Sequence, residues 1–344
     1  MTPTIAVSMG DPGGIGPEVL VKALADQSLR LRARFAVYGL DSCLRRAAEA
    51  AAIRPYWTSL APGLPLPDGP GVFCWNAEQQ SGHASPAFES KDSAEGGRLS
   101  LAWLEAAVQL CKPGRHASQT AHALVTGPIS KASWALAGEV THPGHTGLLA
   151  ARFGVTRYAM MFVSPLLRVI LASDHLALRH VPRAITAWHV RDIIELGHAA
   201  CRRLGISAPR IAVCGLNPHA GERGLLGAED DEDIRPAIDQ ARAKGIDAQG
   251  PFPADTIFLD AIDRPNHPRR FDLVVAMYHD QGLIPVKLLA RDSAVNITVG
   301  LPVPRTSPDH GTAFDIAGKN LAHPGSMTAA LALAVQMAQP GALP

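Results

Sequence analysis

The sequence predicts an α/β protein. Short apolar runs rich in β-branched residues recur along the chain, and each ends in a cluster of Gly, Pro, Asn, Asp or His before a helical pattern begins. This alternation is typical of a parallel or mixed sheet covered by helices. The chain has 344 residues, of which 47% are hydrophobic and 18% charged. That composition supports a large core and excludes a disordered chain.

Charge and cysteine content narrow the class of protein further. Lys and Arg number 32 against 31 Asp and Glu, and no basic run is present, so a nucleic-acid-binding protein is not expected. The five cysteines form no CxxC pair, which argues against a disulfide scaffold. No long apolar stretch indicates a membrane span, and the first residues resemble a strand more than a signal peptide. We therefore expect a soluble, cytoplasmic protein.

Each predicted strand leads into a polar turn. Residues 5–9 precede GDPGGIG, and Pro17 then suits the first turn of a helix. The glycines of this turn do not match GxGxxG, and the turn lacks the Lys-Ser/Thr of a P-loop, so a tight turn is preferred to a classical Rossmann motif. The other predicted strands lie at 123–126, 167–172, 211–216 and 273–277.

Three histidines follow three of these strands. His175, His219 and His279 come after the runs that end near residues 172, 216 and 277. Because the functional crevice of an open α/β sheet lies at the carboxyl ends of its strands, three imidazoles there could bind a divalent metal ion. The alternative is that each histidine only caps a loop or bonds a backbone carbonyl. The residues alone leave both interpretations open.

A second group of candidate site residues has side chains suited to binding anions. Lys287, Asn296 and Arg305 supply an ammonium, an amide and a guanidinium, which are groups that bind phosphate or carboxylate. The alternative is a solvated surface. The acidic run at 229–233 precedes a predicted helix, where its charge offsets the helix dipole, and this structural role is preferred to a metal site.

Taken in order, the motifs resemble the 4-hydroxythreonine-4-phosphate dehydrogenases of vitamin B6 biosynthesis, the PdxA family. The resemblance covers nearly the whole chain. It is carried by MGDPGGIGPE, VTGPISK, PGHT, DHLALR, GLNPHAGE, GPFPADT, MYHDQGLIPVK, VNITVGLP and RTSPDHGTAFDIAGK.

The resemblance implies an isocitrate/isopropylmalate dehydrogenase-like fold, with two α/β lobes around a cleft. We expect residues 1–125 and 256–344 to form the first lobe, which holds the termini and the nucleotide loop. Residues 126–255 would form the second lobe, with the dimer contacts. Family members are homodimers whose active sites use metal ligands from both chains.

The resemblance also assigns site residues. It implies one divalent metal ion per active site (Zn, Mg or Co), and NAD or NADP as cofactor. A carboxylate at Asp315 would favour NAD by repelling a 2′-phosphate. The implied metal ligands are His175, His219 and His279, the implied substrate contacts are His145, Thr146, Lys287, Asn296 and Arg305, and the implied cofactor contacts are Gly311, Thr312, Ala313 and Asp315.

The implied reaction is oxidation of 4-phosphooxy-L-threonine at its C3 hydroxyl. The 3-oxo acid that forms would decarboxylate to 3-amino-2-oxopropyl phosphate. The catalytic proton acceptor is not identified by the sequence, and His145, Asp255 and Asp280 all remain candidates.

Two departures from the family pattern concern the substrate. Gly147 stands where the family commonly has Glu after PGHT, and Ala177 stands where it has Pro. Related dehydrogenases act on 4-phospho-threonate, 4-phospho-erythronate or an aromatic cis-dihydrodiol, and these remain alternative substrates. A more remote alternative is a phosphate acyltransferase of similar fold.

Overall fold

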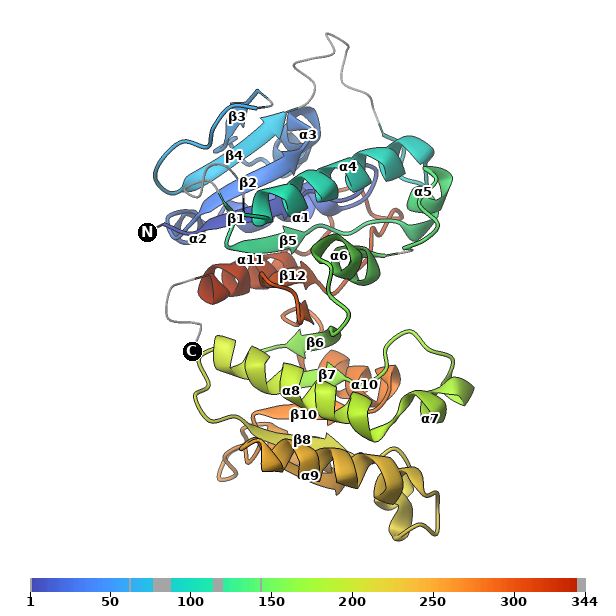
Figure 1. Ribbon diagram of the computed structural model, residues 1–344. Coiled ribbons are helices and arrows are strands. Elements are labelled where there is room, and N and C mark those ends of the chain that lie inside the picture. Colours follow the sequence, from blue (N-terminus) through green and yellow to red (C-terminus); the bar gives the residue numbers. More distant parts are fainter. Residues whose placement is uncertain (1, 62, 77–87, 114–119, 143, 339–344) are drawn as a thin grey trace. The chain divides into compact units, whose positions relative to one another are not determined.

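The computed structural model describes residues 2–61, 63–76, 88–113, 120–142 and 144–338. Helices and strands alternate along this part of the chain (Figure 1), so the predicted α/β class is confirmed. The chain divides into two compact units. Unit 1 comprises Met1–Gly154 and Leu301–Gln339, and unit 2 comprises Val155–Gly300 and Pro340–Pro344.

In unit 1 the strands are all parallel and follow the order β3-β4-β2-β1-β5-β12. The strands are β1 (Thr4–Ser8), β2 (Arg34–Gly39), β3 (Thr58–Leu60), β4 (Gly71–Asn76), β5 (Ala123–Thr126) and β12 (Arg305–Pro308). The helices are α1 (Gly16–Leu24), α2 (Gln27–Arg30), α3 (Asp41–Ala50), α4 (Ala94–Cys111), α5 (Lys131–Leu136), α6 (His145–Phe153) and α11 (Gly325–Met337).

The central strands of unit 1 are buried along their whole length. All residues of β1 and β5 are buried, as expected for parallel strands covered on both faces. The helices begin where the sequence offers capping groups. Ser93, for example, accepts a hydrogen bond from the backbone N–H of Gly96 (3.0 Å) at the start of α4.

In unit 2 the strand order is β11-β6-β7-β10-β8-β9, in which β11, β6 and β7 pair antiparallel and the rest pair parallel. The strands are β6 (Ala159–Val163), β7 (Arg168–Leu171), β8 (Arg210–Cys214), β9 (Asp247–Phe252), β10 (Leu273–Ala276) and β11 (Val295–Val299). The α-helices are α7 (Val181–Ala184), α8 (Ala187–Arg203), α9 (Arg235–Ala243) and α10 (His279–Ala290). Shorter helical turns are η3 (Leu178–His180), η4 (Pro218–Glu222), η5 (Asp230–Ile234) and η6 (Ile257–Ala261).

The unit boundaries differ from the predicted ones. The chain divides after residues 154 and 300, whereas the sequence placed the divisions after 125 and 255. The segment with α5 and α6 belongs to unit 1 because β5 pairs with β1 and α5 packs on α4. The segment with β10 and β11 belongs to unit 2 because these strands pair with β7, β8 and β6. The C-terminal β12 and α11 lie beside β5 in unit 1 (Figure 1).

Two expectations from composition concern cysteines and membranes. All five cysteines are buried, and none forms a disulfide bond. None of the helices in the described ranges combines the length and apolar composition that a bilayer span requires.

Candidate active site

The three predicted metal ligands follow three neighbouring parallel strands of unit 2. The strands β7, β10 and β8 lie side by side in that order. His175 comes shortly after β7, His279 is the first residue of α10 after β10, and His219 lies in η4 after β8. Since parallel strands end at one edge of a sheet, all three histidines come from loops at the same edge of unit 2.

Two of these histidines are neighbours in space. The ring centroids of His175 and His279 are 5.6 Å apart, with an angle of 40° between the ring planes. Asp280 Oδ1 lies 2.7 Å from Nδ1 of His279, and Asp174 accepts a hydrogen bond from the backbone N–H of His175 (2.6 Å). A carboxylate on one ring nitrogen orients the imidazole and leaves the other nitrogen available as a ligand.

His219 does not join this pair. It is exposed and has φ 52°, within a left-handed stretch that continues through Arg223. In the described part of the chain, no three His, Cys, Asp or Glu side chains are grouped so that they could hold a metal ion. The predicted three-histidine set is therefore not assembled there: His175 and His279 are brought together, and His219 stands outside.

The loop that carries His219 is held by a buried carboxylate. Asp230 is 1% exposed, and it accepts hydrogen bonds from the backbone N–H groups of Leu216 (2.9 Å) and Asn217 (3.1 Å). It also accepts one from the side-chain amide of Asn217 (2.9 Å). The acidic run at 229–233 does form a helical start, but one of its members anchors this loop. This role was not predicted from the sequence, although the nearby Asn217 was an available clue.

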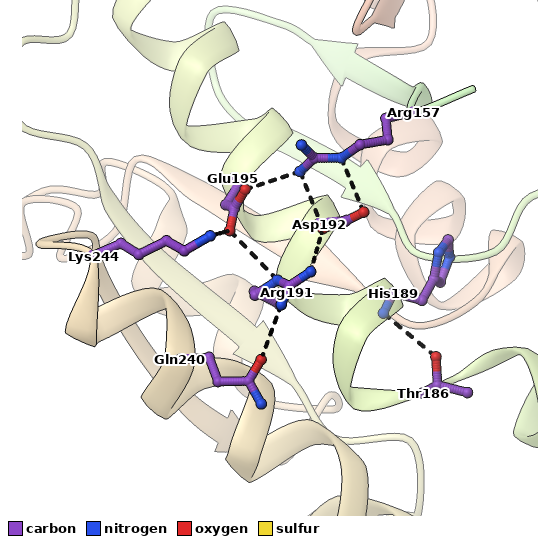
Figure 2. A network of polar contacts seen from close by, with 8 residues as sticks. All are labelled: Arg157, Thr186, His189, Arg191, Asp192, Glu195, Gln240 and Lys244. Carbon is purple, nitrogen blue, oxygen red and sulfur yellow. Dashed lines mark hydrogen bonds and ion pairs between the residues drawn. The ribbon is translucent and has the colours of Figure 1, made fainter. Parts of the chain in front are cut away.

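His189, which was not among the predicted site residues, hydrogen-bonds the backbone at the end of β7. Its Nε2 lies 2.6 Å from the carbonyl oxygen of Ala172, and because a carbonyl only accepts, Nε2 carries the proton. Its backbone N–H donates to Oγ1 of Thr186 (3.4 Å), the N-cap of α8 (Figure 2). This histidine therefore ties α8 to the strand end that leads to His175.

Ion pairs hold α8 in place beside that strand end. Arg157 bridges Asp192 (2.9 Å) and Glu195 (2.9 Å), and Lys244 reaches Glu195 from the end of α9 (2.6 Å), as Figure 2 shows. Residues of α8 and the end of β7 line a cavity of about 430 Å³ that includes His175. The network thus fixes the surroundings of this histidine.

Unit 1 contains a buried arginine that the sequence had singled out. Arg305, at the start of β12, is 3% exposed, and its Nη2 and Nε donate to Oγ1 of Thr126 (2.6 and 3.2 Å). Burial lowers the pKa of Arg305 to about 9, so the guanidinium is still charged at neutral pH. A buried cation is stabilised by a bound anion, and guanidinium binds phosphate or carboxylate through two hydrogen bonds.

His145 accompanies Arg305. It opens α6 and packs edge-on against Trp134, with ring centroids 5.5 Å apart. Burial, and secondarily the charge of Arg305, hold the pKa of His145 well below its usual value of 6.5, so the ring is neutral at pH 7. Its Nε2 is buried and has no hydrogen-bond partner among the described residues. We refer to Arg305, Thr126 and His145 as the anion site.

The remaining predicted substrate contacts are divided between the units. Thr146 follows His145 in the first turn of α6 and is half-buried. Lys287 is exposed on α10, the helix that begins with His279, and Asn296 is half-buried on β11. Thr146 and Arg305 therefore belong to unit 1, and Lys287 and Asn296 to unit 2.

The glycine-rich turn after β1 supports the predicted nucleotide loop. The backbone N–H of Ile15 donates to the carbonyl oxygen of Thr312 (2.9 Å), and a Cβ on Gly14 would lie 2.9 Å from that oxygen. Glu18 accepts a hydrogen bond from the backbone N–H of Ala322 (2.8 Å), on the far side of the loop. The turn therefore supports residues 312–322 through hydrogen bonds and close backbone packing. The sequence predicted only a tight turn here.

The predicted cofactor contacts lie on this supported loop. Gly311 and Asp315 are exposed, and Thr312 and Ala313 are half-buried. Ala313 has φ 42°, in the left-handed region. Of the three candidate proton acceptors, Asp255 and Asp280 are exposed in unit 2, and His145 lies in unit 1.

Comparison with known proteins identifies the family. Residues 75–334 match the family described as "Pyridoxal phosphate biosynthetic protein PdxA". The chain belongs to this family. It is accordingly an oxidoreductase, as the motifs predicted.

Individual relatives match over nearly their whole length. The D-threonate 4-phosphate dehydrogenase of Cupriavidus necator is 42% identical, over 98% of this chain and 97% of its own. The 4-hydroxythreonine-4-phosphate dehydrogenase of Desulfosudis oleivorans is also 42% identical, over 98% of this chain and 96% of its own. The crystal structure of 4-hydroxythreonine-4-phosphate dehydrogenase from Klebsiella pneumoniae superposes with a TM-score of 0.82 at 37% identity, covering 99% of each chain.

Proposed function

We propose that this chain is a metal- and NAD(P)-dependent dehydrogenase of a small phosphorylated hydroxy acid. The preferred substrate is 4-phosphooxy-L-threonine, oxidised at its C3 hydroxyl. The observation that carries the proposal is the 42% identity, over 98% of the chain, to dehydrogenases named for phosphorylated four-carbon acids. The anion site of Arg305 and His145 supports it, because such a substrate carries both a phosphate and a carboxylate.

The histidines of unit 2 suit a divalent metal ion. The rings of His175 and His279 are close together and partly exposed, and imidazole nitrogen is a good ligand for Zn or Co. Because His219 stands outside this pair, we propose that the set is completed where two copies of the chain associate as a homodimer. When bound, the ion would act as a Lewis acid toward the substrate hydroxyl and the later keto oxygen.

The chemical step needs one hydride and one proton to leave the substrate. The C3 hydride would pass to C4 of a bound nicotinamide, and His145, Asp255 or Asp280 would accept the hydroxyl proton, directly or through water. The resulting 3-oxo acid loses its carboxyl group as CO₂. The electron pair of the broken C–C bond goes to the adjacent carbon, which is then protonated to give 3-amino-2-oxopropyl phosphate.

The chain's own residues would position the substrate. Arg305 and Lys287 would bind the phosphate, and Asn296, Thr146 and neutral His145 would donate hydrogen bonds to its polar groups. Binding energy from the phosphate, remote from C3, would thus be used to align the reacting carbon with the nicotinamide. The loop of Gly311, Thr312, Ala313 and Asp315 would hold the adenosine half of the cofactor.

A second substrate is favoured by a specific observation. D-Threonate 4-phosphate bears a hydroxyl where phosphooxythreonine bears an ammonium, and a relative named for it is as similar as one named for the amino acid. Gly147, where the family commonly has Glu, offers no carboxylate to bind an ammonium.

The test is NADH and NADPH formation with each of the two substrates, with and without a chelator. We expect turnover with at least one of them, loss of turnover on chelation, and recovery on addition of Zn, Co or Mg. Turnover that resists chelation would refute the metal requirement. No turnover with either substrate, but turnover of an aromatic cis-dihydrodiol, would favour that alternative class.

A further inference from the structure

Unit 1 contains a cavity of about 220 Å³ whose described walls include none of the predicted substrate contacts. One wall is the glycine-rich turn, with Gly13 and Gly14, and another is the end of the nucleotide loop, with Ala317 and Gly318. The opposite side is α3. The cavity therefore lies where the turn supports the predicted cofactor loop.

The cavity is lined largely by small side chains. The face of α3 toward the cavity presents Cys43, Ala47 and Ala50, at helical spacings of four and three residues, and Phe88 adds an aromatic ring. The small side chains of Cys43, Ala47 and Ala50 leave space for a ligand group. Pockets for whole drug-sized ligands usually exceed about 300 Å³, so this one suits a single end of a dinucleotide.

The cavity also contains one arginine. Arg46 lies on the same face of α3, and its Nη2 is 3.2 Å from Sγ of Cys43. The only carboxylate among the described lining residues is Glu18. Its charge is compensated, because its Oε1 accepts from Lys22 Nζ (2.8 Å) and from the backbone N–H of Ala322 (2.8 Å). Asp315, expected to repel a 2′-phosphate, is not among these lining residues.

We propose that Arg46 is a specificity-determining residue that binds, in this cavity, the 2′-phosphate of an NADP-type cofactor whose adenosine is held on the adjoining loop. The inference rests on the proposed function, since it requires a nicotinamide dinucleotide. Guanidinium forms paired, charge-assisted hydrogen bonds with phosphate, whereas NAD offers only a neutral hydroxyl at this position. The chain therefore prefers NADP, contrary to the expectation based on Asp315.

Binding of nucleotide fragments tests this without turnover. The full-length protein and its Arg46→Gln variant are titrated calorimetrically with 2′,5′-ADP and with ADP. We expect the unaltered protein to bind 2′,5′-ADP about tenfold more tightly than ADP, and the variant to lose that preference while binding ADP as before. The matched control is Arg45→Gln, on the next residue of α3, which pairs with Asp41 and does not line the cavity.

The outcomes distinguish two failures. Equal binding of the two nucleotides by the unaltered protein, or an unchanged preference in Arg46→Gln, would overturn the role of Arg46 alone. A different result would overturn the proposed function and this inference with it. In that case the protein binds neither nucleotide, and neither phosphorylated substrate reduces NAD or NADP. A loss of preference in Arg45→Gln equal to that in Arg46→Gln would also overturn the specific assignment.

Discussion

Burial sets the charge state of Arg305 and His145, two residues of the anion site. Arg305 stays cationic at neutral pH although burial lowers its pKa to about 9, and the same burial keeps His145 neutral. A single buried positive charge beside a neutral hydrogen-bonding ring suits one anionic group of a substrate. The charged state of Arg305 and the neutral state of His145 each lead to a measurable consequence.

Replacing Arg305 by Met should weaken binding of the phosphorylated substrate. Met keeps much of the side-chain volume and removes the guanidinium, so we expect KM to rise about 10- to 100-fold, the equivalent of one or two charge-assisted hydrogen bonds. Steady-state kinetics measure this, and a thermal unfolding curve checks that the variant folds. An unchanged KM in a folded variant would exclude Arg305 from substrate binding.

The neutral state of His145 should appear in the pH dependence of stability. The unfolded chain takes up a proton on this imidazole near pH 6.5, whereas the folded chain does not until a lower pH. The unfolded state therefore binds more protons below about pH 6.5, and the free energy of unfolding falls as the pH drops through that range. Above it, His145 has no such effect.

His145→Gln removes this contribution. Urea unfolding at pH 7 and at pH 5 should show a smaller loss of stability on acidification for the variant than for the unaltered protein. If both lose the same amount, His145 does not have a lowered pKa in the folded state.

At the scale of elements, loops after the strands are held by residues distant in sequence. Asp230, in η5, anchors the loop that carries His219 after β8. His189, in α8, fixes the end of β7. The glycine-rich turn after β1 supports the nucleotide loop through Ile15 and Glu18. Each strand end is thus positioned by a neighbouring element.

Asp230→Asn should loosen the His219 loop. The amide group can accept fewer hydrogen bonds than the carboxylate, so we expect a loss of about 1–3 kcal/mol of stability and a metal affinity lowered about tenfold. Chemical unfolding and metal titration measure the two effects. Asp231→Asn is the control, because Asp231 is a half-buried neighbour that pairs with Arg235. Equal effects at the two positions would contradict the anchoring role.

At the scale of the whole molecule, the described part of one chain does not bring the three predicted metal ligands together. His175 and His279 are neighbours. Among the described residues, His219 does not join them or any other group of three side chains that could hold a metal ion. The homodimer that we propose would account for this, because a second copy could supply the third imidazole. Such sharing can be tested by mixing inactive variants.

His219→Ala and His175→Ala should each abolish metal binding and turnover while the chain still folds. When the two variants are coexpressed in equal amounts, half of the dimers are hybrids. In each hybrid, one of the two sites has intact His175 and His279 from one chain and intact His219 from the other. We therefore expect about a quarter of full activity to return. The control mixture, His175→Ala with His279→Ala, should stay inactive. Recovery in the control but not in the first mixture would refute this division, and activity in His219→Ala alone would remove it as a ligand.

The sequence by itself determined the fold class, the family and the strand-end placement of the three histidines. These depend on local patterns, since alternating apolar runs and turn residues report which segments form strands and where the strands end. It also singled out Arg305 and the nucleotide loop, because their motifs are contiguous in the chain.

Only the tertiary structure decided which residues are neighbours and how deeply they are buried. The unit boundaries depend on the pairing of β5 with β1 and of β10 with β7 and β8. The neutral state of His145 depends on its burial, and the support of residues 312–322 by the glycine-rich turn depends on contacts between segments about 300 positions apart. The cavity beside Arg46 joins four separate segments. Desolvation and long-range hydrogen bonds arise only when the chain packs, so no local pattern records them.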